Sequence, residues 1–86
     1  MKSRGTQDFW ALHHALPQKA RTQARHAFRA FLDNPNHPSL RFKKLKGLHN
    51  YWSVRFGDGY RAVCQRESDS VVWLWIGTHQ AFDKTF

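Results

Sequence analysis

Two stretches near the start of the chain carry apolar residues at helical spacing. In the first stretch these positions lie three or four residues apart: Phe9, Leu12, His13 and Leu16. Thr6 or Asp8 can supply the side-chain oxygen that caps such a helix. The residue before Pro17 disfavours helical geometry. The pattern therefore predicts a short helix that ends at Leu16.

The second stretch is longer and has an apolar side and a basic side. The apolar stripe consists of Ala20, Ala24, Ala27, Phe28, Phe31 and Leu32, and the basic stripe consists of Arg21, Arg25 and Arg29. Pro17 suits the first position of a helix, and Asp33-Asn34-Pro35 predicts its end. A basic stripe of this kind is more often the solvated side of an amphipathic helix than a binding surface. We expect the two helices to form an antiparallel hairpin.

The second half of the chain changes to the alternating pattern of β-strands. Leu40, Phe42 and Leu45 alternate with basic residues, which predicts a first strand. Residues 71–76 are apolar at every position, which is typical of a strand covered on both faces. Residues 78–86 are expected to be a short tail, and residues 1–5 either an edge strand or a loose arm.

Between these strands, residues 53–63 (SVRFGDGYRAV) predict a β-hairpin with one arginine on each arm. A two-residue loop would pair Phe56 with Arg61 and place the arginines on opposite faces. A three-residue loop, Gly57-Asp58-Gly59, would instead pair Arg55 with Arg61. We choose the second register because it gathers the apolar residues on one face and leaves a polar, open face. The apolar face is then Trp52, Val54, Phe56, Tyr60, Ala62 and Cys64.

The order of these elements predicts a single α+β domain over residues 1–86. Two N-terminal antiparallel helices pack on a twisted antiparallel sheet of three to four strands. A hydrophobic content of 41% in 86 residues is enough for a packed core, so disorder is not expected.

Charge and cysteine usage narrow the class of protein further. Fourteen Lys and Arg residues against six Asp and Glu residues give a formal net charge of +8, which favours a polyanion or an acidic protein partner. No apolar run is long enough to span a membrane, and no signal-peptide core follows Met1. Cys64 is the one cysteine, so an internal disulfide is excluded. These features predict a cytoplasmic protein without a membrane partner.

The candidate chemistry is concentrated around the hairpin. Arg55 and Arg61 repel each other when they are paired across two strands, and a bound anion would offset that repulsion. A basic cluster precedes the hairpin: Arg41, Lys43, Lys44 and Lys46. This cluster is a candidate phosphate contact, or alternatively a solvated strand edge. His79 directly follows the apolar strand, where it is a candidate general acid or base or else an inert loop residue.

Other residue patterns carry no chemistry that we can assign. The six histidines and Cys64 lack the spacing of a zinc site, so no metal and no cofactor is expected. Trp73 and Trp75 are more typical of core positions than of base-stacking positions. No nucleotide-binding fingerprint or nucleophile motif is present.

Several of these segments together resemble one known family. The two helices joined at ALP precede NPNHPSLRFKKLKG, YWSVRFGDGYRAV and VVWLWIGTHQAFDK. Over residues 6–84 this arrangement resembles the RelE/ParE superfamily of bacterial type II toxins. The resemblance implies a small α+β fold and an acidic antitoxin partner that wraps and neutralises the toxin.

The resemblance implies two different activities. RelE-like members cut mRNA in the ribosome without a metal, whereas ParE-like members inhibit DNA gyrase. Arg61 in GYR matches the hairpin arginine of the family, and His79 falls where several members carry a basic residue or a histidine. Phe82 stands about where the functional tyrosine of RelE-like members would be, and it has no proton to donate.

We therefore favour a ribosome-dependent mRNA endoribonuclease as the leading hypothesis. Arg55, Arg61 and His79 are its predicted catalytic residues, and Arg41, Lys43, Lys44 and Lys46 are its predicted RNA-binding residues. The expected partners are the antitoxin, the ribosome and mRNA. A gyrase inhibitor that acts by protein binding and a non-toxic member of the fold remain the alternatives.

Overall fold

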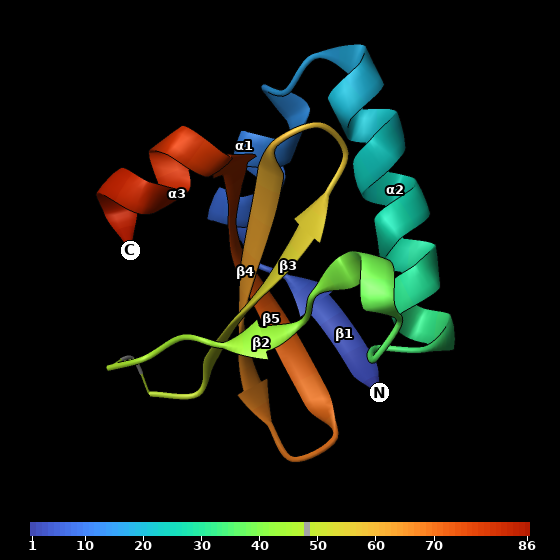
Figure 1. Ribbon diagram of the computed structural model, residues 1–86, viewed down its shortest axis with the longest axis vertical. Coiled ribbons are helices and arrows are strands. Elements are labelled where there is room, and N and C mark those ends of the chain that lie inside the picture. The colour runs from blue at the N-terminus through green and yellow to red at the C-terminus, as the bar shows by residue number, and fades with distance from the viewer. Residues whose placement is uncertain (48) are drawn as a thin grey trace.

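The computed structural model describes residues 1–47 and 49–86 as an α+β fold (Figure 1). Its elements in chain order are β1 (Lys2–Gly5), α1 (Gln7–His14), α2 (Gln18–Asp33), the 3₁₀ turn η1 (Pro38–Leu40), β2 (Lys43–Lys44), β3 (Tyr51–Phe56), β4 (Tyr60–Glu67), β5 (Ser70–Thr78) and α3 (His79–Thr85). The strands form one sheet in the order β1-β5-β4-β3-β2. The predicted fold class is confirmed.

The two N-terminal helices lie close to their predicted bounds, although α1 ends at His14 rather than at Leu16. The Thr6 hydroxyl accepts a hydrogen bond from the backbone N–H of Phe9 at 3.1 Å and so caps α1. Pro17 immediately precedes α2, and Asn34 follows its last residue. α1 packs against β5 and α2 against β3, so each helix covers a different part of one sheet face.

The main core lies between these helices and the sheet. Its buried members come from both layers: Phe9, Phe31, Leu40, Val54, Phe56, Ala62, Cys64, Val71, Trp73 and Ile76. Phe31 is 1% exposed and its ring lies edge-on to Trp73, with 5.3 Å between ring centroids. Phe31 therefore supplies much of the contact that holds α2 on the sheet, whereas Phe28 and Leu32 of the predicted apolar stripe are 41% and 48% exposed.

The register of the arginine hairpin is confirmed. Phe56 pairs with Tyr60 and Arg55 pairs with Arg61, which leaves Gly57-Asp58-Gly59 as the loop. Gly57 and Gly59 have φ angles of 55° and 86°, which glycine adopts more readily than other residues. The loop also contacts α2, because a Cβ atom at Gly57 would overlap the side chain of Gln23.

The sheet differs from the prediction in strand number and direction. It has five strands rather than three or four, and β1 runs parallel to β5. Backbone hydrogen bonds from Lys2 to Asp69 (2.8 Å) and from Thr6 to Trp73 (2.9 Å) flank this pairing. The first residues are thus an edge strand, one of the two alternatives left open. KSRG has no alternating apolar pattern, so its pairing depends on a distant strand rather than on local sequence.

Two further segments differ from the prediction. The strand expected through Leu40 is reduced to Lys43–Lys44, because residues 38–40 form a 3₁₀ turn that buries Leu40. Arg41 then has a φ angle of 46°, which is incompatible with a continuous strand. The expected tail is largely helix α3, whose first turn is capped by the Thr78 hydroxyl at 3.1 Å from the Ala81 nitrogen.

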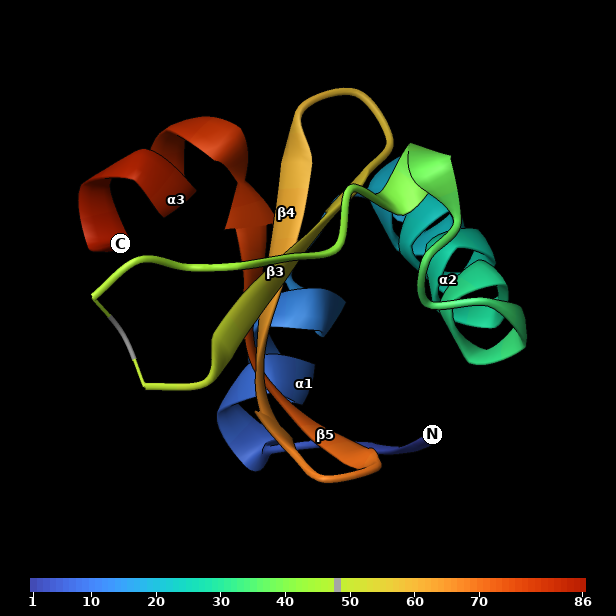
Figure 2. The same ribbon diagram turned by 60° about the horizontal axis from the view of Figure 1, so that its bottom comes forward.

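The sequence predicts that the face carrying the arginines is open to solvent. In the structure, part of this face is covered. Ser53 and Val63 on that face are 0% exposed. A register shift in β4–β5 pairs Cys64 with Trp73 but Val63 with Trp75, so the two tryptophans lie on opposite faces. Figure 2 shows α3 and α2 on opposite sides of the strands. The short helix α3 therefore covers a second, smaller apolar layer.

Within the described residues, none of the helices combines the length and the apolar character needed to cross a membrane.

Candidate functional site

Arg55 and Arg61 form the centre of the candidate site. They are directly opposed on β3 and β4, and their partners on the same face include Gly77 of β5. Arg55 is exposed, whereas Arg61 is partly buried. Two arginine side chains therefore leave the sheet on the same face, next to a residue without a side chain.

The C-terminal helix holds the side chain of Arg61 in place. The guanidinium carbon lies 5.5 Å from the centroid of the Phe82 ring, within the range of a cation–π contact. Phe82 is supported in turn by Phe86, at 5.4 Å between ring centroids, and by Trp75, at 6.2 Å. This aromatic cluster on α3 and β5 turns one arginine of the pair into a fixed group.

His79 lies at the junction of β5 and α3, beside the hairpin loop. Its backbone N–H donates to the carbonyl of Gly59 at 2.7 Å. Its Nε2 atom lies 3.3 Å from Oδ1 of Asp83, one helical turn later, and its ring centroid lies 6.4 Å from that of Phe82. Phe82 therefore has Arg61 and His79 as neighbours, and Asp83 orients the imidazole.

The electrostatics of this surface favour an anion. The ion pairs found among the described residues are Lys19–Asp58 and His79–Asp83, so neither arginine of the pair is neutralised there by a carboxylate. Directly opposed like charges destabilise a sheet. A phosphate group that accepts hydrogen bonds from both guanidinium groups would relieve this repulsion.

The predicted basic cluster divides between the two faces. Lys43 pairs with Ser53 and so lies on the arginine face, whereas Lys44 pairs with Trp52 and lies on the helix side. Arg41 follows the 3₁₀ turn and Lys46 follows β2, so strand pairing assigns neither to a face. The structure thus brings Lys43 together with Arg55 and Arg61, and separates Lys44 from them.

Other reactive side chains offer no second centre of chemistry. Burial raises the pKa of the Cys64 thiol to about 12, so this side chain remains a neutral thiol. Across residues 1–47 and 49–86, no cluster of three or more His, Cys, Asp and Glu side chains has the proximity needed for a metal ion.

Two contributors to this site were not singled out from the sequence. Asp83 is the partner of His79, and Phe86 supports the Phe82 ring. The signal was present: Phe82 and Phe86, like His79 and Asp83, are spaced four residues apart, as on one side of a helix. Recognising it required residues 79–85 to be read as a helix rather than as a tail.

The chain is similar in fold to several toxins of known structure. The RelE toxin in the RelB-RelE antitoxin-toxin complex from Methanococcus jannaschii gives a TM-score of 0.72 at 20% identity, covering 95% of this chain and 96% of that chain. A YoeB/ParE toxin from Agrobacterium tumefaciens gives 0.73 at 19% identity, with 92% and 99% covered. The toxin-antitoxin complex RelBE2 from Mycobacterium tuberculosis gives 0.65 at 25% identity, with 90% and 88% covered.

Sequence comparison gives the family. A search of curated proteins found no match. The family model for the ParE-like toxin domain, however, matches residues 18–84, which is most of the chain and includes the arginine hairpin and His79. The protein belongs to the ParE-like toxin domain family, within the RelE/ParE superfamily.

Proposed function

We propose that this protein is the toxin of a type II toxin-antitoxin system and that it cleaves mRNA on the ribosome. The observation that carries this proposal is the opposed pair Arg55 and Arg61, with His79 held beside the same aromatic ring as Arg61. Two opposed cations and an adjacent imidazole are the groups needed to bind a phosphodiester and to move a proton.

In this mechanism the 2′-hydroxyl of the RNA attacks the adjacent phosphorus atom, and the bond to the 5′-oxygen of the next nucleotide breaks. Arg55 and Arg61 bind the non-bridging oxygens and stabilise the negative charge that develops on them. Lys43, on the same face as the arginines, contacts a neighbouring phosphate. Each of these groups acts through charge.

His79 moves the proton. Its contact with Asp83 occupies Nε2, so Nδ1 is the nitrogen that accepts the proton. The imidazole accepts the proton of the 2′-hydroxyl, and the leaving 5′-oxygen is protonated by the imidazolium or by water. Phe82 carries no proton, so in this proposal it positions Arg61 and His79 and takes no chemical part.

The proposed partners follow from charge and from the family. An acidic antitoxin suits a protein with a formal net charge of +8. Relatives of the same fold have been solved as RelB-RelE complexes with their antitoxins. The ribosome and mRNA are the proposed targets in the cytoplasm.

A second function has its own support. The matching family model is that of ParE-like toxins, and Phe82 has no hydroxyl group to contribute to catalysis. Inhibition of DNA gyrase through a protein-binding surface would need neither His79 nor a general acid.

The decisive experiment is primer extension on mRNA from a translating extract, run with and without a chelator, beside a gyrase supercoiling assay. The nuclease predicts cuts only on translated message, and these cuts survive chelation. Arg61→Ala should lower the cleavage rate about 10²–10³-fold and His79→Ala about 10²–10⁴-fold.

Matched controls come from α2, on the other side of the sheet. Arg29→Ala and His26→Ala remove an exposed arginine and an exposed histidine, and both variants should cleave at the normal rate. Intact message together with blocked supercoiling would instead support gyrase inhibition. Full cleavage by His79→Ala would remove His79 from the mechanism.

A further inference from the structure

The loop of the arginine hairpin connects two helices that lie on opposite faces of the sheet. Figure 2 shows this loop, Gly57-Asp58-Gly59, at the end of β3 and β4, with α2 on one side and α3 on the other. Arg55 lies two residues before the loop, and Arg61 lies two residues after it. A shift of the loop therefore moves both arginines of the candidate site.

On the α3 side, the loop is bound to His79 through the backbone. The N–H of His79 donates to the carbonyl of Gly59 at 2.7 Å, and Thr78, the residue before it, pairs with Tyr60. A hydrogen bond of this length fixes the separation between the loop and the first residue of α3. The position of His79 thus depends on the position of Gly59.

On the α2 side, the loop packs against Gln23. The carboxamide of Gln23 occupies the space into which a Cβ atom at Gly57 would project. Gly59 has a positive φ angle as well, but none of the described residues except its chain neighbours comes within 4 Å of a Cβ atom placed there. Gly57 is therefore required both for its φ angle and for its contact with α2, and Gly59 for its φ angle alone.

The other contact between the loop and α2 is an exposed ion pair. Nζ of Lys19 lies 3.8 Å from Oδ2 of Asp58, and these side chains are 80% and 85% exposed. Exposed ion pairs contribute little to stability and are screened by salt. Gln23 is partly buried, so it is the firmer of the two contacts.

Neighbouring elements give the end of the hairpin little other support on this side. In the pairing that the described residues show, β2 contacts β3 at Trp52 and Ser53, so residues 54–56 extend past it. α2 is the element beside them, and it contacts β3. The contact between Gln23 and Gly57 thus supports the part of the hairpin that β2 does not reach.

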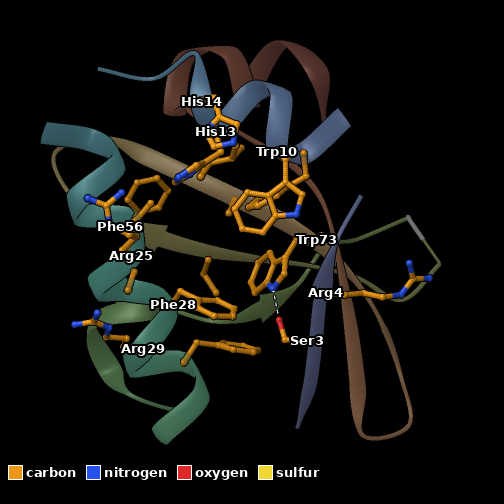
Figure 3. A pocket seen from close by; sticks show the side chains of 18 residues that line it. Ser3, Arg4, Trp10, His13, His14, Arg25, Phe28, Arg29, Phe56 and Trp73 are labelled. Atoms are coloured by element: carbon orange, nitrogen blue, oxygen red, sulfur yellow. Dashed lines mark hydrogen bonds between the residues drawn. The ribbon is translucent and has the colours of Figure 1, made fainter. Parts of the chain in front are cut away.

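On its other side, α2 borders open space. A groove of about 490 Å³ lies between α1, α2, β1 and the sheet, with Trp10 and Phe28 among its lining residues (Figure 3). Arg25 and Arg29 form its rim on the α2 side, and Arg4 lies on the opposite side. Because this side of α2 is open, the position of the helix relative to the hairpin depends more on the contact at the loop.

We propose that Gln23 is a positioning residue of the candidate site. It holds the hairpin loop in place and thereby places Arg55, Arg61 and His79 relative to one another. This inference rests on the proposed function, in which these three side chains act on one phosphodiester. Gln23 itself does not contact the RNA. Its effect passes through the loop, and a misplacement of catalytic groups by about 1 Å can lower a rate about 10²-fold.

Hydrogen exchange followed by NMR tests the placement of His79 independently of activity. Gln23→Ala removes the support beside Gly57, so the amide of His79 should exchange about tenfold faster. Exchange in the centre of β4 should stay the same, which separates a local shift from a loss of overall stability. Gln23→Met, similar in length and volume, should restore slow exchange. Gln18→Ala, at an exposed glutamine of the same helix, is the matched control and should leave exchange unchanged.

A double-mutant cycle tests the contact itself. Gly57→Ala and Gly59→Ala both place a side chain at a positive φ angle, but only Gly57→Ala also collides with Gln23. Adding Gln23→Ala should therefore recover part of the stability that Gly57→Ala loses and none of the stability that Gly59→Ala loses. Urea denaturation of the single and double variants gives both comparisons.

The cleavage assay shows whether this placement affects the proposed reaction. Gln23→Ala should lower the cleavage rate about tenfold, and Gln23→Met should restore it. Normal cleavage by Gln23→Ala, unchanged exchange at His79, or equal recovery of the two glycine variants would each overturn the role of Gln23 and leave the nuclease in place. Intact message with the wild-type protein, together with faster exchange in Gln23→Ala, would contradict the nuclease and retain Gln23 as the support of the loop.

Discussion

Arg55 and Arg61 are paired residues of the same type in different surroundings. Arg55 is exposed, whereas Arg61 lies over the Phe82 ring. Their mutual repulsion lowers the free energy of unfolding by the same amount whichever arginine is considered. The aromatic contact of Arg61 adds back about 0.5–1 kcal/mol. The two residues should therefore respond differently to substitution.

We expect Arg55→Ala to raise the free energy of unfolding by a few tenths of a kcal/mol, because it removes only repulsion. Arg61→Ala should lower it by up to about 1 kcal/mol, because the cation–π contact is lost as well. Urea denaturation of both variants checks the order. If Arg55→Ala were the less stable protein, the exposed arginine would have a stabilising partner, and repulsion from Arg61 would not be its main interaction.

His13 gives the stability of the protein a defined pH dependence. Its pKa is lowered in the folded protein relative to an ordinary value of 6.5, so the unfolded chain takes up the proton first. The free energy of unfolding should therefore fall as the pH drops through about 6.5 and level off below the folded pKa. Denaturation at several pH values tests this, and His13→Gln should flatten the curve in that window while His26→Gln should not.

At the scale of elements, α3 packs on the sheet with little buried area. None of its residues is buried, and its contacts with the sheet are made through Phe82 and Phe86 on Trp75. Elements with little buried apolar area open locally at low free energy. The same helix positions Arg61 and His79, so the proposed catalytic site depends on a weakly held segment.

We expect Phe86→Ala to loosen α3 without unfolding the domain. The change removes one aromatic contact with Trp75, at 5.5 Å between ring centroids, and one with Phe82. Hydrogen exchange should become faster in residues 79–85 and stay unchanged in β4, while cleavage falls. A global loss of protection would show that α3 belongs to the cooperative core.

The elements also show what sequence patterns can and cannot predict. The hairpin register followed from the residues because the alternative would have placed the apolar side chains on both faces. The parallel pairing of β1 could not be predicted from the residues, because its partner strand β5 is distant in the sequence. The opposite orientations of Trp73 and Trp75 depend on a register shift that no local pattern indicates.

Of the candidate site, the sequence predicts the parts that depend on local pairing and not the parts that depend on helix packing. Arg55 and Arg61 were brought together by a local turn, and His79 lies beside them because β5 is adjacent to β4. The groove was not predicted, because it lies between α1 and α2 and depends on how far apart the helices pack. Trp10 was not assigned to any apolar stripe, although it lines the groove.

At the scale of the whole molecule, positive charge lies on both sides of the sheet. Arg55, Arg61 and Lys43 lie on one face, and the arginines of the groove rim lie on the other. An acidic antitoxin of the kind proposed therefore has basic residues to bind on both sides of the sheet. The affinity of such a complex would come largely from electrostatic attraction between exposed charges.

We therefore expect the affinity of the antitoxin complex to fall steeply with added salt, because exposed charges are screened over about 8–10 Å at physiological ionic strength. Isothermal titration across a salt series measures this. The double variant of Arg55 and Arg61 to alanine should show a weaker salt dependence, and the Lys19→Ala variant on the exposed start of α2 serves as the control. A complex insensitive to both salt and the double change would contradict an electrostatic interface.

The pairing of β1 with β5 also determines when the sheet can finish folding. The indole N–H of Trp73 donates to the Ser3 hydroxyl at 2.7 Å, so the first strand is fixed by a residue 70 positions later in the chain. Contacts so distant in sequence give a fold a high contact order and delay its closure. While the chain is being translated, β1 has no neighbour, and Arg61 lacks both Gly77 and Phe82 beside it. A nascent chain should thus be inert toward the ribosome that makes it until β5 and α3 have been made and have packed beside Arg61.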